Sequence, residues 1–370
     1  MARIKRVEIR MVDLKPKVQR TDAIQSFVSQ ETPFVVVTDE DGAFGVGYSY
    51  TIGTGGPAVV SLLKETLAPM LIGREAEEIE RIWRDLLFKT HATAVGAITS
   101  LALAAIDTAL WDLRCMRASL PLWRMAGGAK PSIDLYSTEG GWLHIETAAL
   151  VDDALAVKAQ GFAGSKIKVG RPTLMQDSER LAAVRAAVGD DYRLMVDANQ
   201  AFHFHEALMR SRMLAEHGVS WFEEPMPADD LAGHIRLAQQ SPVPIAVGES
   251  MYSPGQFADY LRMGACSIVQ VDVARVGGIT PWLKVAHMAE AMNVAVCPHF
   301  LMELHVSLVC AIPNSWMLEY IPQLDTIAGN RLDIRDGRAF PSDAPGLGID
   351  WDMPAIVSQT VAGSHSVHGG

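Results

Sequence analysis

Three acidic residues in the middle of the chain each follow an apolar run. Asp197 follows RLMV, Glu223 follows VSWF and Glu249 follows PIAVG, so the intervals 197–223 and 223–249 are both 26 residues. Three carboxylates that converge repel one another unless a cation lies between them. Helix N-capping after a strand would explain one or two of these acidic residues, but it does not explain three of them at equal intervals. An all-oxygen ligand set favours a hard ion such as Mg²⁺, so we predict these residues as metal ligands.

Basic residues end other apolar runs of the same region. Lys166 and Lys168 are two positions apart, so both point to one face of a strand. Each ammonium group disfavours the charge of the other, which predicts a lysine pKa lowered toward the range of a general base. A solvated strand edge is the alternative for two lysines alone. Their alignment with the carboxylate strands favours catalysis.

His299 follows VAVCP, and Asp272 follows SIVQV one segment earlier. An aspartate at the same end of the neighbouring strand can accept a hydrogen bond from the Nδ1 proton of the histidine and fix its tautomer. A lone histidine is more often a satisfied polar residue, so the pairing with Asp272 is what favours a catalytic role. Glu319, at the end of a last short strand, is expected to form a hydrogen bond at the same rim.

The elements that position these residues alternate between strand and helix from residue 128 to 324. A barrel of parallel strands carries its chemistry at the carboxyl ends of those strands, and eight strands fit this region. Helices are expected over residues 148–160, 175–188 and 281–292, the last with Thr280 as N-cap. The expected strands cover 133–138 and 316–319 at the two ends, and those between end at Lys168, Asp197, Glu223, Glu249, Asp272 and near Pro298.

A separate α+β unit precedes the barrel. Residues 3–14, 34–38 and 44–51 have strand patterns, and helical periodicity follows from about 58 to 125, so residues 1–127 are predicted as one domain. The glycines of 45–47 and 53–56 lack phosphate-loop spacing and are expected in turns. Residues 325–370 have no helical period and are expected to return to the first domain, ending in a frayed tail.

Composition limits the possible partners and compartment. The 370 residues carry a net charge of −11, which argues against a nucleic-acid partner. The apolar stretch 94–113 contains two aspartates and is better explained as a buried helix than as a membrane span. The four cysteines form no CxxC pair and the N-terminus has no signal-peptide core. We therefore expect a soluble cytoplasmic protein with no membrane partner.

The motifs together resemble the enolase superfamily, and within it the mandelate racemase subgroup, over nearly the whole chain. The resemblance implies an α/β fold, a modified TIM (β/α)7β barrel with an N-terminal α+β capping domain that the C-terminal segment completes. The matching motifs are KIK (Lys166, Lys168), VDAN (Asp197, Asn199), FEEP (Glu223), GES (Glu249), VDVARVGGIT (Asp272), PHF (His299) and LEY (Glu319).

The resemblance implies abstraction of the proton α to a carboxylate, with one Mg²⁺ per site stabilising an enediolate. A Lys or His base with Mg²⁺ is a known pairing for this superfamily. By analogy, Lys168 and His299 face opposite sides of the α-carbon, Lys166 neutralises the substrate carboxylate and Glu319 bonds to it. Such a two-sided site can racemise a substrate, or it can eliminate a β-hydroxyl as water.

In this family the capping-domain loops select the substrate, here residues 16–30 and 50–56. Their polar residues disfavour an apolar ring in the pocket. PHFLMELH, ARVGGITP and LDIRDGRAFPSDAPGLGI are similar to acid-sugar dehydratases of the talarate/galactarate type. We therefore expect an acid-sugar dehydratase acting on a small carboxylate. The alternatives are a racemase or epimerase of an α-hydroxy acid and a non-catalytic sugar-acid or metal-binding barrel. A homo-oligomer is expected, and the expected substrate-binding residues are Asn199, Arg20, Asp22 and Tyr50.

Overall fold

The N-terminal part of the chain forms a four-stranded antiparallel sheet covered by helices. The structure, a computed structural model, describes residues 2–370. The sheet has the order β16 (Ser366–Gly369), β1 (Ile4–Asp13), β4 (Glu31–Asp39) and β5 (Phe44–Tyr48). Strands β4 and β5 join at Gly42, whose φ of 84° suits a tight turn. This meander agrees with the strand patterns in the sequence.

Helix α3 (Ala97–Ala118) packs directly on this sheet. An added Cβ at Gly47 would lie 2.1 Å from the carbonyl oxygen of Ala105, and one at Gly45 would lie 2.3 Å from that of Ala109. The expectation that Gly45 and Gly47 form a turn is therefore wrong, because they let β5 and α3 approach closely. The other helical segments here are α1 (Gly56–Leu62), Leu63–Leu67, Ala68–Met70, α2 (Ile79–Lys89) and α4 (Leu122–Met125).

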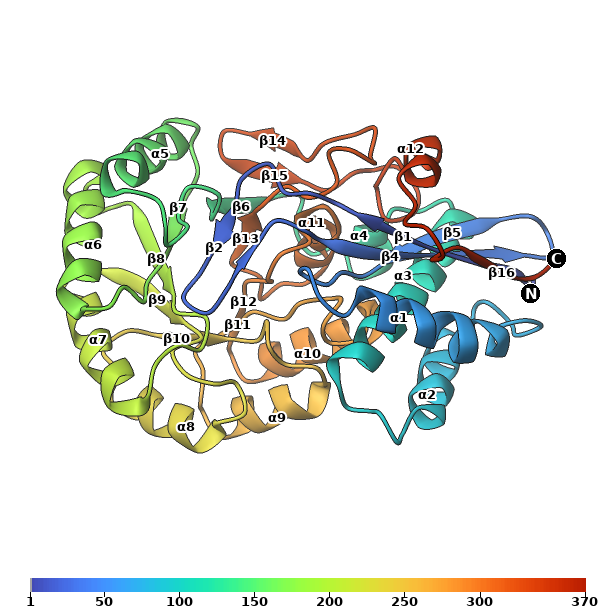
Figure 1. Ribbon diagram of the computed structural model, residues 1–370, viewed down its shortest axis with the longest axis horizontal. Coiled ribbons are helices and arrows are strands. Elements are labelled where there is room, and N and C mark those ends of the chain that lie inside the picture. The colour runs from blue at the N-terminus through green and yellow to red at the C-terminus, as the bar shows by residue number, and fades with distance from the viewer. Residues whose placement is uncertain (1) are drawn as a thin grey trace.

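Eight parallel strands form the barrel (Figure 1). Pairing runs in chain order, and β13 closes the barrel by pairing with β6, while Val296 of β12 bridges to Ser315 just before β13. The strands are β6 (Ile133–Ser137), β7 (Gly164–Lys168), β8 (Arg193–Asp197), β9 (Val219–Glu223), β10 (Ile245–Val247), β11 (Ile268–Val269), β12 (Ala295–Val296) and β13 (Met317–Tyr320).

Three of the barrel strands are shorter than the sequence pattern predicts. β10 stops two residues before Glu249 and β11 stops three residues before Asp272, so both acids lie in the loops that follow. Gly248 explains the first end, because its φ is 149° and an added Cβ would lie 2.6 Å from the backbone of Gln270. β12 ends before Pro298, which has no N–H for a sheet hydrogen bond.

Helices surround the barrel, and one of them begins earlier than predicted. Helix α10 starts at Ile279 with Gly278 as N-cap, so Thr280 lies inside it. The backbone N–H of Thr280 is instead bonded to Asp107 of α3 at 2.9 Å. The helices are α5 (Thr147–Ala159), α6 (Leu174–Val188), α7 (Phe204–Glu216), α8 (Leu231–Gln240), α9 (Pro254–Arg262), α10 (Ile279–Ala291) and α11 (Met302–Ala311).

The C-terminal segment contacts both parts of the molecule. Strands β14 (Asp333–Arg335) and β15 (Arg338–Phe340) form a hairpin that pairs with β6 of the barrel. Helix α12 (Met353–Ser358) follows in a region without a visible helical period. β16 then pairs with β1, so the expectation of a frayed tail is wrong. The two ends of the chain consequently lie near each other at the edge of the capping sheet (Figure 1).

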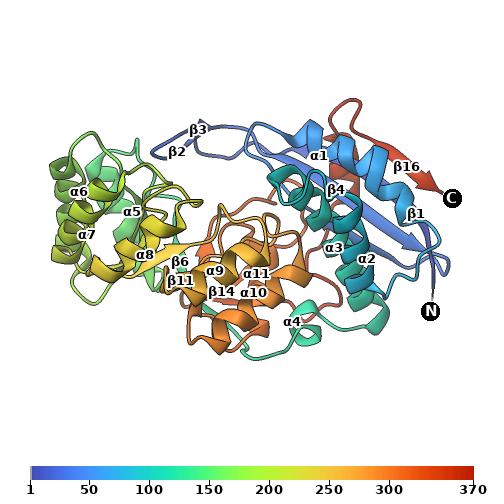
Figure 2. The same ribbon diagram turned by 90° about the horizontal axis from the view of Figure 1, so that it is seen from below.

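A short hairpin links the capping domain to the barrel mouth. Strands β2 (Arg20–Thr21) and β3 (Ser26–Phe27) project from the capping sheet toward the barrel (Figure 2). The backbone N–H of Leu143, in the loop after β6, donates to Thr21 at 2.9 Å. Within the described chain, none of the helices combines the length and apolarity that a bilayer crossing requires.

Candidate active site

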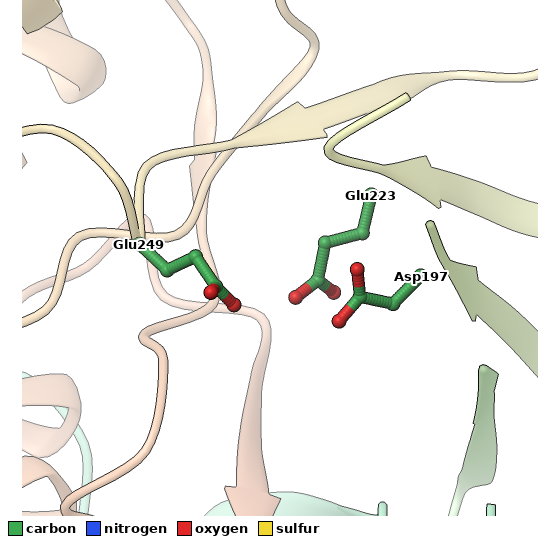
Figure 3. Close-up of side chains that lie close together, drawn as sticks. All are labelled: Asp197, Glu223 and Glu249. Carbon is green, nitrogen blue, oxygen red and sulfur yellow. The ribbon is translucent and has the colours of Figure 1, made fainter. Parts of the chain in front are cut away.

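Asp197, Glu223 and Glu249 meet at the carboxyl ends of three neighbouring strands. One carboxylate oxygen from each lies within 4.8 Å of those of the other two, and all three side chains are buried. Figure 3 shows the three carboxylates turned toward a common space. Because β8, β9 and β10 are adjacent in chain order, the regular spacing in the sequence becomes proximity at one rim of the barrel.

The charges of this trio are poorly compensated by the protein alone. Burial, and then the nearby charge of Asp197, raise the pKa of Glu223 to about 7. Burial also opposes ionisation of Asp197, but Lys168 and Lys166 hold the pKa of Asp197 below its ordinary value. A buried all-oxygen set with this excess of negative charge fits a hard divalent cation.

Lys166 lies between the trio and the last barrel strand. Its Nζ is 2.8 Å from Glu223 Oε1 and 2.8 Å from Glu319 Oε1. Burial alone would lower the pKa of Lys166, but the two glutamates raise it well above the ordinary value. Lys166 is therefore a fixed positive charge in the floor of the site.

Lys168 also points inward, as the alternation along β7 predicts. Its Nζ donates to Asp197 Oδ2, and to Asn199 Oδ1 at 2.9 Å. Burial and Lys166 both lower the pKa of Lys168, but Asp197 and Glu249 outweigh them, so the pKa lies above its ordinary value. The prediction that the pKa of Lys168 is lowered is wrong while no cation lies between the three carboxylates. The spacing of the two lysines in the sequence gives no information on the acidic residues that surround them in the fold.

His299 and Asp272 form the expected pair. His299 Nδ1 is 2.8 Å from Asp272 Oδ2, and His299 Nε2 is 3.1 Å from Glu249 Oε2. Burial lowers the pKa of His299, but Glu249 and the hydrogen bond to Asp272 raise it overall. Tyr50 of the capping domain donates its hydroxyl to the same Asp272 oxygen at 2.6 Å. The pair of His299 and Asp272 therefore contacts Glu249 of the barrel and Tyr50 of the capping domain.

Glu319 is held in place by three groups. Its Oε1 accepts from Thr138 Oγ1 at 2.6 Å and its Oε2 accepts from the backbone N–H of Phe300 at 2.8 Å. Burial would raise the pKa of Glu319, but the charge of Lys166 lowers it below its ordinary value. Glu319 is thus an ionised acceptor beside Lys166.

The expected substrate-binding residues fall into two groups. Asn199, Asp22 and Tyr50 line the cavity above the trio, together with Lys168, His299 and Glu319. Arg20 is absent from that lining within the described chain. It donates to Glu139 Oε1 at 2.8 Å, and its guanidinium lies between the rings of Trp142 and Phe300. Arg20 therefore pairs with Glu139 and not with Asp22, and its expected contact with the substrate stays a prediction.

Several residues of the site were missed from the sequence. Arg275 lines the cavity and donates to the carbonyl oxygen of Glu249 at 2.9 Å. Gln270 donates to Glu223 Oε2 at 2.6 Å. Trp142 lies with its ring centroid 5.3 Å from Lys168 Nζ. Arg275 and Gln270 flank Asp272 in the sequence, so their place in the site could have been predicted. No sequence feature near Trp142 indicates that it lies in the site.

Comparison with known families covers most of the chain in two parts. Residues 6–127 match the family described as mandelate racemase / muconate lactonizing enzyme, N-terminal domain. Residues 149–355 match the family described as enolase C-terminal domain-like.

Similar proteins include enzymes that act on sugar acids. The chain is 36% identical over 313 residues to the L-talarate/galactarate dehydratase of Salmonella typhimurium, a match covering 85% of this chain and 78% of that protein. It is also 36% identical over 324 residues to the 3,6-anhydro-alpha-L-galactonate cycloisomerase of Streptomyces coelicolor, covering 87% and 89%.

The fold is also similar to solved structures over its full length. A crystal structure of the Salmonella typhimurium L-talarate/galactarate dehydratase with Mg and L-lyxarohydroxamate has a TM-score of 0.94 and 33% identity, covering 100% of this chain and 95% of that one. An L-talarate dehydratase from Polaromonas sp. with Mg and L-glucarate has a TM-score of 0.92 and 34% identity, covering 100% of both chains.

Proposed function

The chain belongs to the mandelate racemase/muconate lactonizing enzyme family of the enolase superfamily, and from this premise we propose that it is a Mg²⁺-dependent acid-sugar dehydratase. The reaction removes the proton α to the substrate carboxylate and the hydroxyl on the β-carbon. The product is a 2-keto-3-deoxy acid.

The observation that carries this proposal is the two-sided arrangement of proton-transfer groups. Lys168 is the last residue of β7 and His299 follows β12, on opposite flanks of the arc formed by β8, β9 and β10. Both side chains line the same cavity. One group can therefore take a proton from one face of a bound acid while the other gives a proton to a leaving group.

Mg²⁺ would be held by Asp197, Glu223 and Glu249, and when bound it supplies stabilisation for negative charge that develops on the substrate carboxylate. Lys166 adds a fixed positive charge beside that position. Glu319 accepts hydrogen bonds from the protein and orients Lys166. Asp272 holds the imidazole of His299 through Nδ1, leaving Nε2 toward the cavity side.

The proton and electron balance needs no further reactant. Lys168 takes the α-proton, and the C–H electron pair moves into the substrate carboxylate and then forms the C–C double bond of an enol. The β-carbon–oxygen bond breaks, and the leaving hydroxyl takes a proton from His299 to become water. The enol then tautomerises to the ketone, with a proton returning to carbon. The Asp272 carboxylate, 2.8 Å from Nδ1, favours the protonated imidazole that this step requires.

Proton NMR in D₂O tests the proposal directly. The chain with Mg²⁺ is incubated with a panel of aldonates and aldarates, and with mandelate. Loss of a sugar acid with a new methylene signal beside a ketone supports dehydration. Absence of both dehydration and α-deuterium incorporation across the panel contradicts the proposal.

A racemase or epimerase of α-hydroxy acids is the second candidate, because the same two-sided arrangement can remove a proton from one face and return it to the other. Deuterium at the α-carbon with loss of optical activity, and with no keto product, would favour this candidate.

We also propose that the chain forms a homo-oligomer in the cytoplasm. Ile24 and Val28 of the capping loop are 57% and 62% exposed, and assembly would cover such apolar side chains. The four cysteines are free and buried, which supports a reducing compartment. Light scattering of the purified chain measures its mass in solution, and a monomer would contradict the proposed assembly.

A further inference from the structure

The charges around the cavity bear on which class of sugar acid the site accepts, an inference that rests on the proposed function. Aldonates carry one carboxylate and aldarates carry a second at the far end of the carbon chain. The first carboxylate would lie near the trio and Lys166. A diacid therefore needs a positive charge or a set of donors where its far carboxylate ends.

Within residues 2–370, the lysine and arginine side chains that line the cavity are Lys168 and Arg275, and each already has an acidic partner. Lys168 is bonded to Asp197, and Arg275 is bonded to the carbonyl oxygen of Glu249 at 2.9 Å with its Nη1 3.5 Å from Glu249 Oε1. Both cations therefore already have an acidic partner in the neighbourhood of the trio.

The capping loop adds an acid, and no base, to the lining of this cavity. Arg20 is 2% exposed and is neutralised by Glu139, away from the cavity lining. Asp22 lines the cavity, with Oδ1 accepting from the backbone N–H groups of Ile24 and Gln25, both at 2.8 Å. This capping leaves Oδ2 as an acceptor. A carboxylate placed there either meets a like charge or requires a proton, and both weaken its binding.

The remaining loop residues suit an uncharged, hydroxylated chain end. Gln25 offers an amide donor and acceptor, and Asp22 offers an acceptor for a hydroxyl proton. Phe27, Trp142 and Ile321 add apolar walls that suit the C–H groups of a sugar acid. We propose that the substrate is a monocarboxylic sugar acid, an aldonate whose far end is a hydroxyl group that Asp22 and Gln25 bind, and that aldarates are disfavoured.

The test compares acids that differ only in the far group. The full-length chain with Mg²⁺ is assayed on matched pairs with the same configuration at carbons 2 to 5, namely galactonate with galactarate, gluconate with glucarate and mannonate with mannarate. We expect kcat/KM for the monoacid of the best pair to exceed that of its diacid by at least ~10-fold, because a like charge opposes the diacid.

Two variants test whether the capping loop that contains Asp22 causes the preference for monoacids. Asp22→Asn keeps the Oδ1 acceptor that caps the turn, so its fold should be retained, and we expect it to raise the diacid-to-monoacid ratio of kcat/KM. Ile24→Lys adds a cation to the same turn and should raise that ratio further. Asp325→Asn is the control, since it removes an equal charge from a residue that pairs with Lys17 outside this cavity. Its ratio should match the wild type.

The outcomes separate this inference from the function on which it rests. A wild-type preference for the diacid of the best pair, or an unchanged ratio in both Asp22→Asn and Ile24→Lys, would overturn the monoacid assignment while leaving dehydration intact. If no member of any pair loses water or exchanges its α-proton, the proposed function fails and the assignment fails with it.

Discussion

Asp272 connects the two domains at the level of single atoms. Its Oδ2 accepts from Tyr50 of the capping domain at 2.6 Å and lies 2.8 Å from His299 Nδ1, while its Oδ1 accepts from the backbone N–H of Ala274 at 2.8 Å. Burial would raise the pKa of Asp272, but His299 holds it at about 2. An ionised Asp272 with these donors fixes the direction of the imidazole.

Replacing Tyr50 with Phe should slow the reaction without unfolding the chain. The variant keeps the ring that packs 4.6 Å from Phe300 but loses one hydrogen bond to a charged acceptor, a contribution of about 1.5–3 kcal/mol. We expect kcat to fall roughly 10-fold. Tyr48→Phe is the control, because the Tyr48 hydroxyl is buried and has no hydrogen-bond partner within residues 2–370. Equal kcat values for the two variants would contradict this role for Tyr50.

The two proton-transfer groups should have separable effects. Lys168→Ala should abolish both dehydration and α-deuterium incorporation, because it removes the proposed base. His299→Asn should lose dehydration by about 10²–10⁴-fold, the usual contribution of a general acid, yet keep measurable α-exchange. NMR in D₂O measures both steps in one sample. Loss of α-exchange in His299→Asn but not in Lys168→Ala would reverse the two assignments.

At the scale of elements, helix α3 joins the capping domain to the barrel. Asp107 accepts from the backbone N–H of Thr280 at the start of α10, and Trp111 donates to the Thr280 hydroxyl at 2.9 Å. Ser100 donates to the carbonyl oxygen of Tyr252 at 3.0 Å. These bonds hold the loop that contains Asp272 against the domain that contains Tyr50.

Asp107 should make the stability of the chain depend on pH. Burial raises its pKa from the ordinary value of 3.8 to about 7 in the folded chain. A raised folded pKa contributes stability below pH 4 that is lost as the pH rises toward 7, at about 1.4 kcal/mol per unit of pKa difference. Asp107→Asn should remove this loss, so its free energy of unfolding in urea should gain on the wild type as the pH rises from 4 to 7. If the free energies of unfolding of the wild type and Asp107→Asn change with pH in the same way, the raised pKa of Asp107 is contradicted.

The elements also show what the sequence could and could not predict. The barrel strands and the residues at their ends follow from apolar runs and regular spacing, so Asp197, Glu223 and Lys168 were expected together. The start of α10 was not predictable, because the carboxylate that accepts from the backbone N–H of Thr280 belongs to Asp107, which is distant in sequence. The pKa of Lys168 and the partner of Arg20 likewise depend on acids that other elements bring close.

At the scale of the whole molecule, the site is complete only when both domains are in place. The barrel supplies Glu249, Lys168 and His299 to the cavity lining, and the capping domain supplies Tyr50, Asp22 and Gln25. Trp83 of α2 donates to the carbonyl oxygen of Gly277 at 2.8 Å, and β16 ties the end of the chain to β1. Folding of the capping sheet and assembly of the substrate cavity are therefore coupled.

Binding of Mg²⁺ should stabilise this whole assembly, because the cation relieves repulsion that the folded chain contains. A ligand that binds only the folded state adds about 2.7 kcal/mol at 100 times its Kd, and more at higher concentration. The melting temperature should therefore rise with the logarithm of the Mg²⁺ concentration above Kd. Glu223→Gln removes the trio member whose pKa burial and Asp197 raise to about 7. At pH 8 without metal this variant should melt at or above the wild-type temperature, and Mg²⁺ should shift it far less. Calorimetric melting with and without Mg²⁺ measures both effects, with Asp325→Asn as the charge-matched control. A wild-type melting temperature that does not respond to Mg²⁺ would contradict the assignment of the trio as its ligands.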